Sequence, residues 1–154
     1  MRMGFTLIEL IVVLGMLATL TGLSYLTLFG RIQQADVSSA VVSLVADLRL
    51  QQVRAMSGEQ TNGSTSYGVH LDANRYVIFS GSTYSANDPG NTAFPANGAH
   101  LSTTFAGGNV IFTPGSGEIS GFSSSANAIT ATSTEGGASK TIRLNRYGVV
   151  ASEN

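Results

Sequence analysis

Glu9 is the side chain whose position in the sequence most clearly calls for a chemical role. It is the only charged residue among the 25 positions from Phe5 to Phe29, of which 17 are Phe, Leu, Ile, Val, Met, Ala or Tyr. A carboxylate near the middle of a bilayer costs about 2.5 to 3.5 kcal/mol, so a chain that keeps one there is expected to use it. The alternative is a shallow position in the first turns of a helix, within reach of water and headgroups.

His70 and Asp72 form the second candidate, because residues two apart on a strand lie on the same face. The only other histidine is His100, and the chain has no cysteine. It also lacks a nucleophile elbow, a Walker loop, an HExxH motif and a spaced pair of carboxylates. We therefore expect no enzymatic activity and no cofactor, with His70 as a surface strand residue. Asp72, Asn74 and Asp88 have oxygens that suit calcium, but turns favour Asp and Asn for backbone reasons, so we expect turns and no metal.

The apolar stretch must be positioned by a helix that can cross a membrane. At about 1.5 Å per residue, 25 helical residues reach roughly 37 Å, against roughly 30 Å for the hydrocarbon core. A cleaved secretory signal, a permanent anchor and a buried core helix all have this composition. The run is too long for a conventional signal, and its small residue, Gly4, precedes the apolar residues instead of following them. A buried helix is disfavoured because only 11% of the residues are charged and little chain remains to cover it.

The segment Gly4-Phe5-Thr6-Leu7-Ile8-Glu9-Leu10, followed by an unbroken apolar run, resembles the class III leader of type IV prepilins and pseudopilins. The resemblance implies that a prepilin peptidase cuts between Gly4 and Phe5 and that the new amino terminus of Phe5 is methylated. It also implies that Glu9 pairs with the terminal amine of a neighbouring subunit in a filament. The partners implied are other pilin or pseudopilin subunits, the peptidase, an inner-membrane assembly platform and, before assembly, membrane lipid.

The physical chemistry of the segment agrees with that resemblance. Cleavage would place a cationic amine four residues from Glu9. Because an unpaired buried charge is costly, pairing between subunits stabilises one axial alignment of neighbouring subunits over the others. Most of the assembly energy is expected from apolar packing of the helix in a bundle. The residues assigned to this packing are Leu7, Ile8, Leu10, Ile11, Val12, Leu14 and Leu17, with Gly15 and Gly22 allowing close approach.

Beyond Gly30 the chain becomes more polar but keeps a helical period. Val37, Val41, Leu44, Val45 and Leu48 form one apolar stripe, which we assign to a core, and the helix is predicted to end near Ser57-Gly58. The period then changes to two, which predicts a hairpin of residues 66–71 and 75–80. Residues 81–108 are predicted to be a polar surface loop around a strand at 99–103. A strand at 109–113, a hairpin of 129–134 and 140–145, and a final turn and short strand at 147–150 follow.

This order of elements, with the closing sequence Ile142-Arg143-Leu144-Asn145-Arg146-Tyr147-Gly148, resembles the H-type minor pseudopilins (GspH/FimT-like). The fold class expected is α+β, pilin-like, with a long N-terminal helix packed on a C-terminal antiparallel β domain. The expected organisation is a leader peptide at 1–4, a transmembrane and filament-core helix at 5–29, an amphipathic continuation at 30–57 and a β-sheet domain at 58–154.

The function implied by the resemblance is structural. It is that of a subunit, minor by this likeness, of a type II secretion pseudopilus or a type IV pilus. The location implied is the bacterial inner membrane, with a single pass and the C-terminal domain in the periplasm or outside the cell, and then the filament. The alternatives are a major type IV pilin or a minor pilin that binds DNA during DNA uptake. A formal net charge of −1 leaves only local contacts for DNA, at Lys140, Arg143 and Arg146. Three phosphate contacts would give weak, salt-sensitive binding.

Overall fold

The computed structural model describes residues 6–154, apart from the side chains of residues 26–30 and 32. Its fold class is α+β, with one long helix, α1 (Leu7–Ser57), a short 3-10 helix, η1 (Ala106–Gly108), and eight strands in two antiparallel sheets. The described chain divides into two units, one that ends at residue 32 and one of residues 33–154. The first unit contains the beginning of α1, and the second contains the rest of α1 together with both sheets.

The predicted helix is confirmed from its first turn to its end. At its start, the Thr6 hydroxyl accepts the backbone N–H of Glu9 at 3.3 Å, which satisfies one of the free donors of the first turn. No proline interrupts the sequence between Leu7 and Ser57. The helix ends where Gly58 takes a φ of 69°, a left-handed conformation that glycine adopts without the steric cost of a Cβ.

The first sheet has the strand order β3-β2-β1-β5. Its strands are β1 (Tyr67–Asp72), β2 (Arg75–Ser80), β3 (Thr92–Pro95) and β5 (Asn109–Phe112). The hairpin predicted between β1 and β2 is confirmed, and its register pairs Asp72 with Arg75 across a two-residue turn. Both outer strands, β3 and β5, are only four residues long.

The second sheet has the strand order β4-β6-β7-β8. Its strands are β4 (Ala99–Thr103), β6 (Ala128–Ser133), β7 (Ser139–Leu144) and β8 (Val150–Glu153). The hairpin predicted from β6 and β7 is confirmed. The final turn and short strand predicted at residues 147–150 are confirmed in kind, but the strand extends beyond this range to Glu153. In the turn, the Asn145 side chain accepts the backbone N–H groups of Tyr147 and Val149 at 2.9 and 3.0 Å. These hydrogen bonds hold the turn, so the last strand begins at Val150.

The prediction that residues 81–108 form a polar surface loop around one strand was incomplete. This stretch contains β3 as well as the expected β4, and it contributes Ala96, Ala99, Leu101 and Phe105 to the core. Strand β3 has no apolar and polar alternation of its own, and it exists through its pairing with β2, where Phe94 stands opposite Tyr76. Short edge strands of this kind leave little signal in a sequence.

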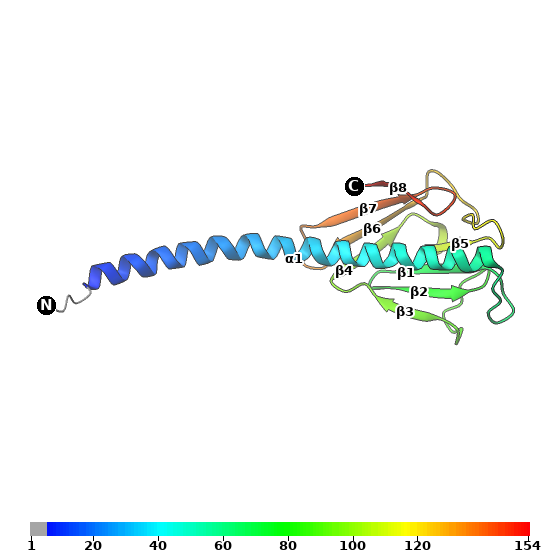
Figure 1. Cartoon of the computed structure of the whole chain (residues 1–154), viewed down its shortest axis with the longest axis horizontal. Helices are drawn as coiled ribbons and strands as arrows, with labels where there is room; N and C mark the ends of the chain where they lie inside the picture. Colours follow the sequence, from blue (N-terminus) through cyan, green and yellow to red (C-terminus); the bar gives the residue numbers. More distant parts are fainter. Residues whose placement is uncertain (1–5) are drawn as a thin grey trace. The chain divides into compact units, whose positions relative to one another are not determined.

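One hydrophobic core holds the second unit together. The predicted stripe is confirmed, because Val37, Val41, Leu44 and Leu48 are buried and pack with residues from β1, β2, β4, β5, β6 and β7. Figure 1 shows the second half of α1 running along these strands. The stripe continues to Gln51, which is fully buried although it is polar.

Candidate functional site

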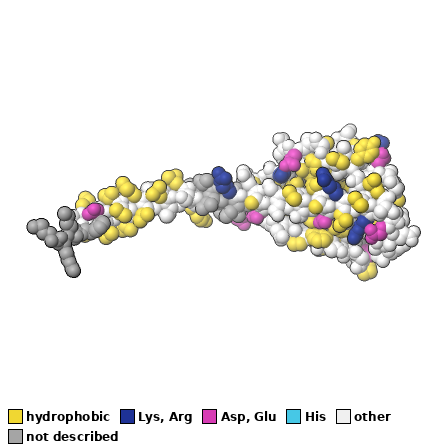
Figure 2. Space-filling model, viewed as in Figure 1, with side chains coloured by type: hydrophobic (Ala, Val, Ile, Leu, Met, Phe, Trp, Pro, Cys, Tyr) yellow, Lys and Arg dark blue, Asp and Glu magenta, His cyan; other side chains and the backbone are white. Residues whose placement is uncertain are grey.

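The first part of α1 is long and apolar enough to cross a membrane. The span Leu7–Tyr25 has 19 residues and a mean hydropathy of 2.1, and none of it is buried within the chain. Figure 2 shows hydrophobic side chains along this helix. Apolar surface of this extent is normally covered by lipid or by another polypeptide. The side chains predicted to pack in a bundle are all exposed, and they are Leu7, Ile8, Leu10, Ile11, Val12, Leu14 and Leu17.

Glu9 lies in the first turn of α1 and is exposed. A carboxylate is favoured there, because the free N–H groups at the start of a helix carry a partial positive charge. In the described part of the chain Glu9 forms no ion pair. Gly4 and Phe5, the predicted cleavage and methylation positions, lie outside the described residues.

The polar groups inside the apolar span are arranged to suit a membrane. The hydroxyls of Thr19, Thr21 and Ser24 donate to backbone carbonyls three or four residues earlier, at 2.8 to 3.1 Å. These bonds satisfy the hydroxyls where no water is available. A Cβ added at Gly15 or Gly22 would meet no atom within 4 Å, so these two positions form flat, open places on the helix surface. Another helix can approach closely there.

His70 belongs to a cluster on the outer face of the first sheet. Its Nδ1 lies 2.8 Å from Oδ1 of Asn109 and its Nε2 lies 3.2 Å from Oδ1 of Asp72, and its ring stacks on Tyr84 at 3.9 Å. The prediction that His70 and Asp72 lie on the same face of their strand is therefore confirmed. His70 lies on a strand and on the outer face, as predicted, but the Tyr84 ring stacks on it and only 16% of its side chain is exposed.

The Asp72 carboxylate is engaged by two side chains. Arg75 donates to it at 2.9 Å, and this hydrogen bond, more than the charge of His70, holds the pKa of Asp72 below its ordinary value of 3.8. Of the other residues considered as calcium ligands, Asp88 accepts the Gly90 N–H at 2.8 Å within a turn. Asn74 lies in the turn between β1 and β2, and its backbone carbonyl accepts the Ala96 N–H. The arrangement stabilises loops around the first sheet, and no group of three His, Cys, Asp or Glu residues gathers among residues 6–154.

The three basic residues considered for DNA contact do not form one patch. Lys140 and Arg143 stand three apart on β7, which places their side chains on opposite faces of the sheet. The Lys140 ammonium lies 2.6 Å from Oε1 of Glu153, and Arg143 donates to the side chain of Asn127 at 3.2 Å. Arg146 is exposed beyond the end of β7. A nucleic acid would therefore meet separate positive charges, of which Lys140 is already paired.

Two sets of contacts between α1 and the rest of the second unit, one to a strand and one to loops, were not predicted from the sequence. Tyr76 donates its hydroxyl to Oδ2 of Asp47 at 2.6 Å, and burial together with this bond raises the pKa of Tyr76 far above its ordinary value of 10.0. Gln52 donates its side-chain amide to the carbonyls of Gly117 and Tyr147. The partners are between 29 and 95 residues apart in the sequence, so no local sequence pattern predicts these contacts. The one available signal was that Asp47 falls off the apolar stripe.

Comparison of the chain with family models, with curated proteins and with solved structures finds no match in any of the three. The candidate functions therefore depend on the sequence and on the geometry described above.

Proposed function

We propose that this protein is a structural subunit of a type IV pilus or a type II secretion pseudopilus, with a pilin-like fold. The observation that carries the proposal is the apolar span Leu7–Tyr25, which is exposed throughout and has Glu9 as its only charge. The described part of the chain does not cover this apolar surface. In the proposal, lipid covers it before assembly and neighbouring subunits cover it in the filament. The sequence that begins at Gly4 supplies a signal for processing before that exchange.

In this proposal the chain resides in the bacterial inner membrane until a prepilin peptidase removes residues 1–4. The amine exposed at Phe5 in one subunit then pairs with Glu9 of its neighbour, and the pair selects the axial register because a mismatched subunit would bury an uncompensated charge. Packing of the apolar helices supplies most of the stability. Residues 33–154, with their own buried core, remain folded outside the bundle.

The role of a minor, H-type subunit is supported by the closing sequence Ile142 to Gly148 and by the two sheets that follow the helix. The DNA-uptake alternative receives no such support, because Lys140 is paired with Glu153 and Arg143 lies on the other face of β7. We therefore assign the chain to filament structure and not to nucleic-acid capture.

Processing is tested by expressing the full chain with a prepilin peptidase and measuring the intact mass. The parent chain should begin at a methylated Phe5, and Gly4→Leu should remain an uncut, membrane-retained precursor. Met3→Leu, a neighbouring change that leaves the cleavage pair intact, is the matched control. A normal mature terminus in Gly4→Leu would contradict the assignment.

Assembly is tested separately with Glu9→Leu. This variant should insert and be cleaved normally, because a leucine lowers the cost of insertion. It should be depleted in sheared filaments by at least about tenfold, because without the ion pair a subunit in the correct register is less stable by on the order of 1.4 kcal/mol or more. Parent-like incorporation of Glu9→Leu would remove the proposed role of the carboxylate.

A further inference from the structure

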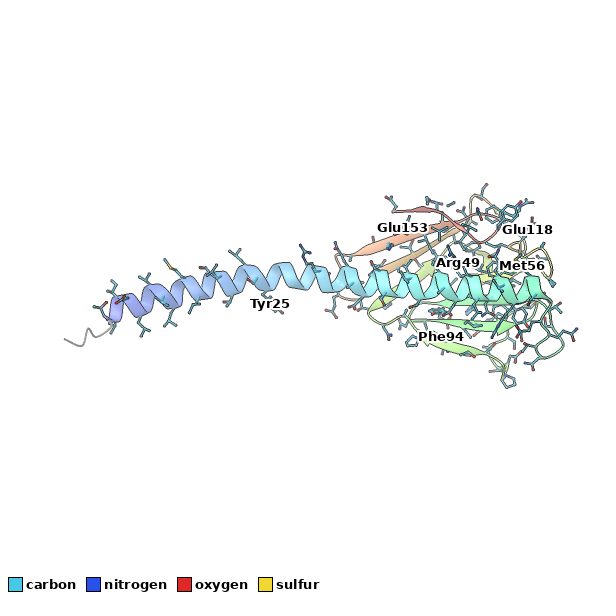
Figure 3. All side chains as sticks on the ribbon, viewed as in Figure 1. Tyr25, Arg49, Met56, Phe94, Glu118 and Glu153 are labelled. Carbon is cyan, nitrogen blue, oxygen red and sulfur yellow. The ribbon has the colours of Figure 1, made fainter. Side chains whose placement is uncertain are left out.

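A groove of about 410 Å³ lies between α1 and the edge strand β3, within the second unit. The helix contributes Ser43 and Asp47 to its lining, and the sheet side contributes Tyr76, Phe94 and Asn97. Figure 3 labels Phe94 on β3, below α1 in that view. The groove lies apart from the apolar span on which the proposed function depends, so it can be assigned and tested independently.

The carboxylate in this groove is fixed in place by the protein itself. Oδ2 of Asp47 accepts the hydroxyl of Tyr76, whose side chain is 3% exposed. Because burial and the hydrogen bond raise the pKa of Tyr76, the phenol stays protonated and the negative charge resides on Asp47. Oδ1 of Asp47 forms no hydrogen bond with the described residues and remains available to a ligand.

The aromatic wall of the groove favours positive charge as well. Tyr76 and Phe94 stack with their centroids 5.4 Å apart and their planes 16° from parallel, and Phe94 is only partly buried. The faces of aromatic rings are electron-rich and attract cations. No basic residue lines this groove: Arg49, two residues further along α1, lines a different groove that includes Lys140.

The number of free acceptor atoms distinguishes between kinds of cation. A guanidinium binds a carboxylate best through two parallel hydrogen bonds, which need both oxygens. In Asp47 Oδ2 already accepts the Tyr76 hydroxyl, so Oδ1 is the oxygen without a partner among the described residues, and a guanidinium would have to share Oδ2 with Tyr76. An ammonium is a compact charge that needs only one carboxylate oxygen. Ser43 and Asn97 also line the groove and offer further oxygen acceptors that form no hydrogen bond with the described residues.

We propose that this groove binds a primary ammonium group on an alkyl chain, as in a lysine side chain of a partner protein. The ammonium pairs with Oδ1 of Asp47, and the methylene groups lie against Phe94 and Ala46. The hydroxyls of a neutral sugar could form hydrogen bonds with the same polar groups, but they would leave the charge of Asp47 uncompensated.

The proposal is tested with the full chain in nanodiscs of zwitterionic lipid, by ligand-observed NMR titration. Nα-acetyl-lysine methylamide should bind saturably, with a Kd on the order of 1 mM, as expected for a single exposed charge pair with an aromatic contact. Nα-acetyl-norleucine methylamide, which lacks the ammonium, should not saturate, and the arginine analogue should bind more weakly than the lysine compound. These comparisons use the parent chain and do not depend on any variant folding.

Variants then locate the site. Asp47→Asn keeps an oxygen to accept the Tyr76 hydroxyl but should weaken lysine binding at least about tenfold, and Phe94→Leu should weaken it about threefold. Asp88→Asn removes one negative charge from the loop before β3, outside the lining of the groove, and should have no effect. Thermal unfolding followed by circular dichroism establishes that each variant is folded.

Three results would overturn the assignment. They are equal binding of the lysine and norleucine compounds, no saturable binding of lysine to the parent chain, and the same affinity in Asp47→Asn as in Asp88→Asn. Binding of a neutral monosaccharide that survives Asp47→Asn would assign the groove to sugars instead.

Discussion

Gly148→Ala should destabilise the protein because Gly148 is confined in two ways. It lies in the turn before β8 with a φ of 66°, a left-handed conformation that residues with a Cβ seldom adopt. A Cβ placed there would lie 2.6 Å from Cε1 and 3.1 Å from Cζ of Phe112. Phe112 is fully buried in the core, so a shift of its ring would have to be accommodated by neighbouring core side chains.

The two penalties can be added from their separate magnitudes. The left-handed conformation costs an alanine about 1 to 2 kcal/mol. Crowding a packed core costs about 1 to 3 kcal/mol more. The total, about 2 to 5 kcal/mol, is a large share of the roughly 5 to 15 kcal/mol that stabilises a typical domain.

Gly121→Ala is the matched control for this prediction. Gly121 has a φ of 63°, nearly that of Gly148, but a Cβ there meets no atom within 4 Å. It should therefore show only the conformational cost. Unfolding of the full chain in detergent micelles, followed by the near-ultraviolet circular dichroism of its tyrosines, should give a midpoint for Gly148→Ala that is lower than the parent's by roughly 10 °C and clearly below that of Gly121→Ala.

A double substitution identifies the source of the difference. Phe112→Leu combined with Gly148→Ala should lose less stability than the sum of the two single variants, because the smaller side chain relieves the contact. Equal losses in Gly148→Ala and Gly121→Ala, or strict additivity with Phe112→Leu, would refute the argument that the Phe112 ring restricts this position.

Three further changes test other contacts in the second unit. Gln51→Leu should raise the free energy of unfolding by about 1 to 3 kcal/mol, because the buried side-chain amide of Gln51 has no hydrogen-bond partner among the described protein atoms; an unchanged or lower value by denaturant unfolding would contradict this. Tyr67→Phe should lower it by about 1 kcal/mol by removing the hydroxyl that donates to the Glu59 carbonyl at 3.0 Å, again measured by denaturant unfolding. Asp72→Asn should lower stability at neutral pH but converge with the parent below pH 4. The hydrogen bond from Arg75 lowers the folded-state pKa of Asp72, so the stability it contributes is present above the unfolded-state pKa and is lost as the pH falls through the folded-state value. A gap between the two proteins that persists in acid would contradict this account.

The helix and the two hairpins were predictable because their signals are local. A stripe such as Val37, Val41, Leu44 and Leu48 repeats within a few residues, and burial of one helix face follows directly from that repeat. The hairpin of β1 and β2 is likewise encoded by two short alternating runs around a two-residue turn.

The elements that were missed depend on partners distant in sequence. Strand β3 is held by β2, and its Phe94 is partly buried because it stacks on Tyr76. The extent of β8 was predicted only in part, because Asn145 closes the preceding turn with its side chain, a hydrogen bond that composition does not reveal. The contact of the Asp47 carboxylate was missed because its partner, the Tyr76 hydroxyl, lies 29 residues away along the chain.

The two candidate sites differ in the same way. The isolation of Glu9 is visible in the sequence because every residue around it is uncharged. The groove beside β3 is not visible, because its carboxylate and its aromatic wall come from segments that only the folded chain brings together. A single charged residue within an apolar segment can thus be recognised in a sequence. A site whose residues come from distant segments can be recognised only once the fold is known.

The helix α1 therefore presents two surfaces that need different environments. Between residues 33 and 55 one stripe is buried and the protein supplies its own cover. Between Leu7 and Tyr25 the side chains are exposed all round, and Glu9 has no ion-pair partner among the described residues. Under the proposed function, neighbouring subunits supply both the cover and the counter-charge of this segment. Changes at Glu9 should accordingly alter assembly while leaving the unfolding transition of residues 33–154 where it is in the parent chain.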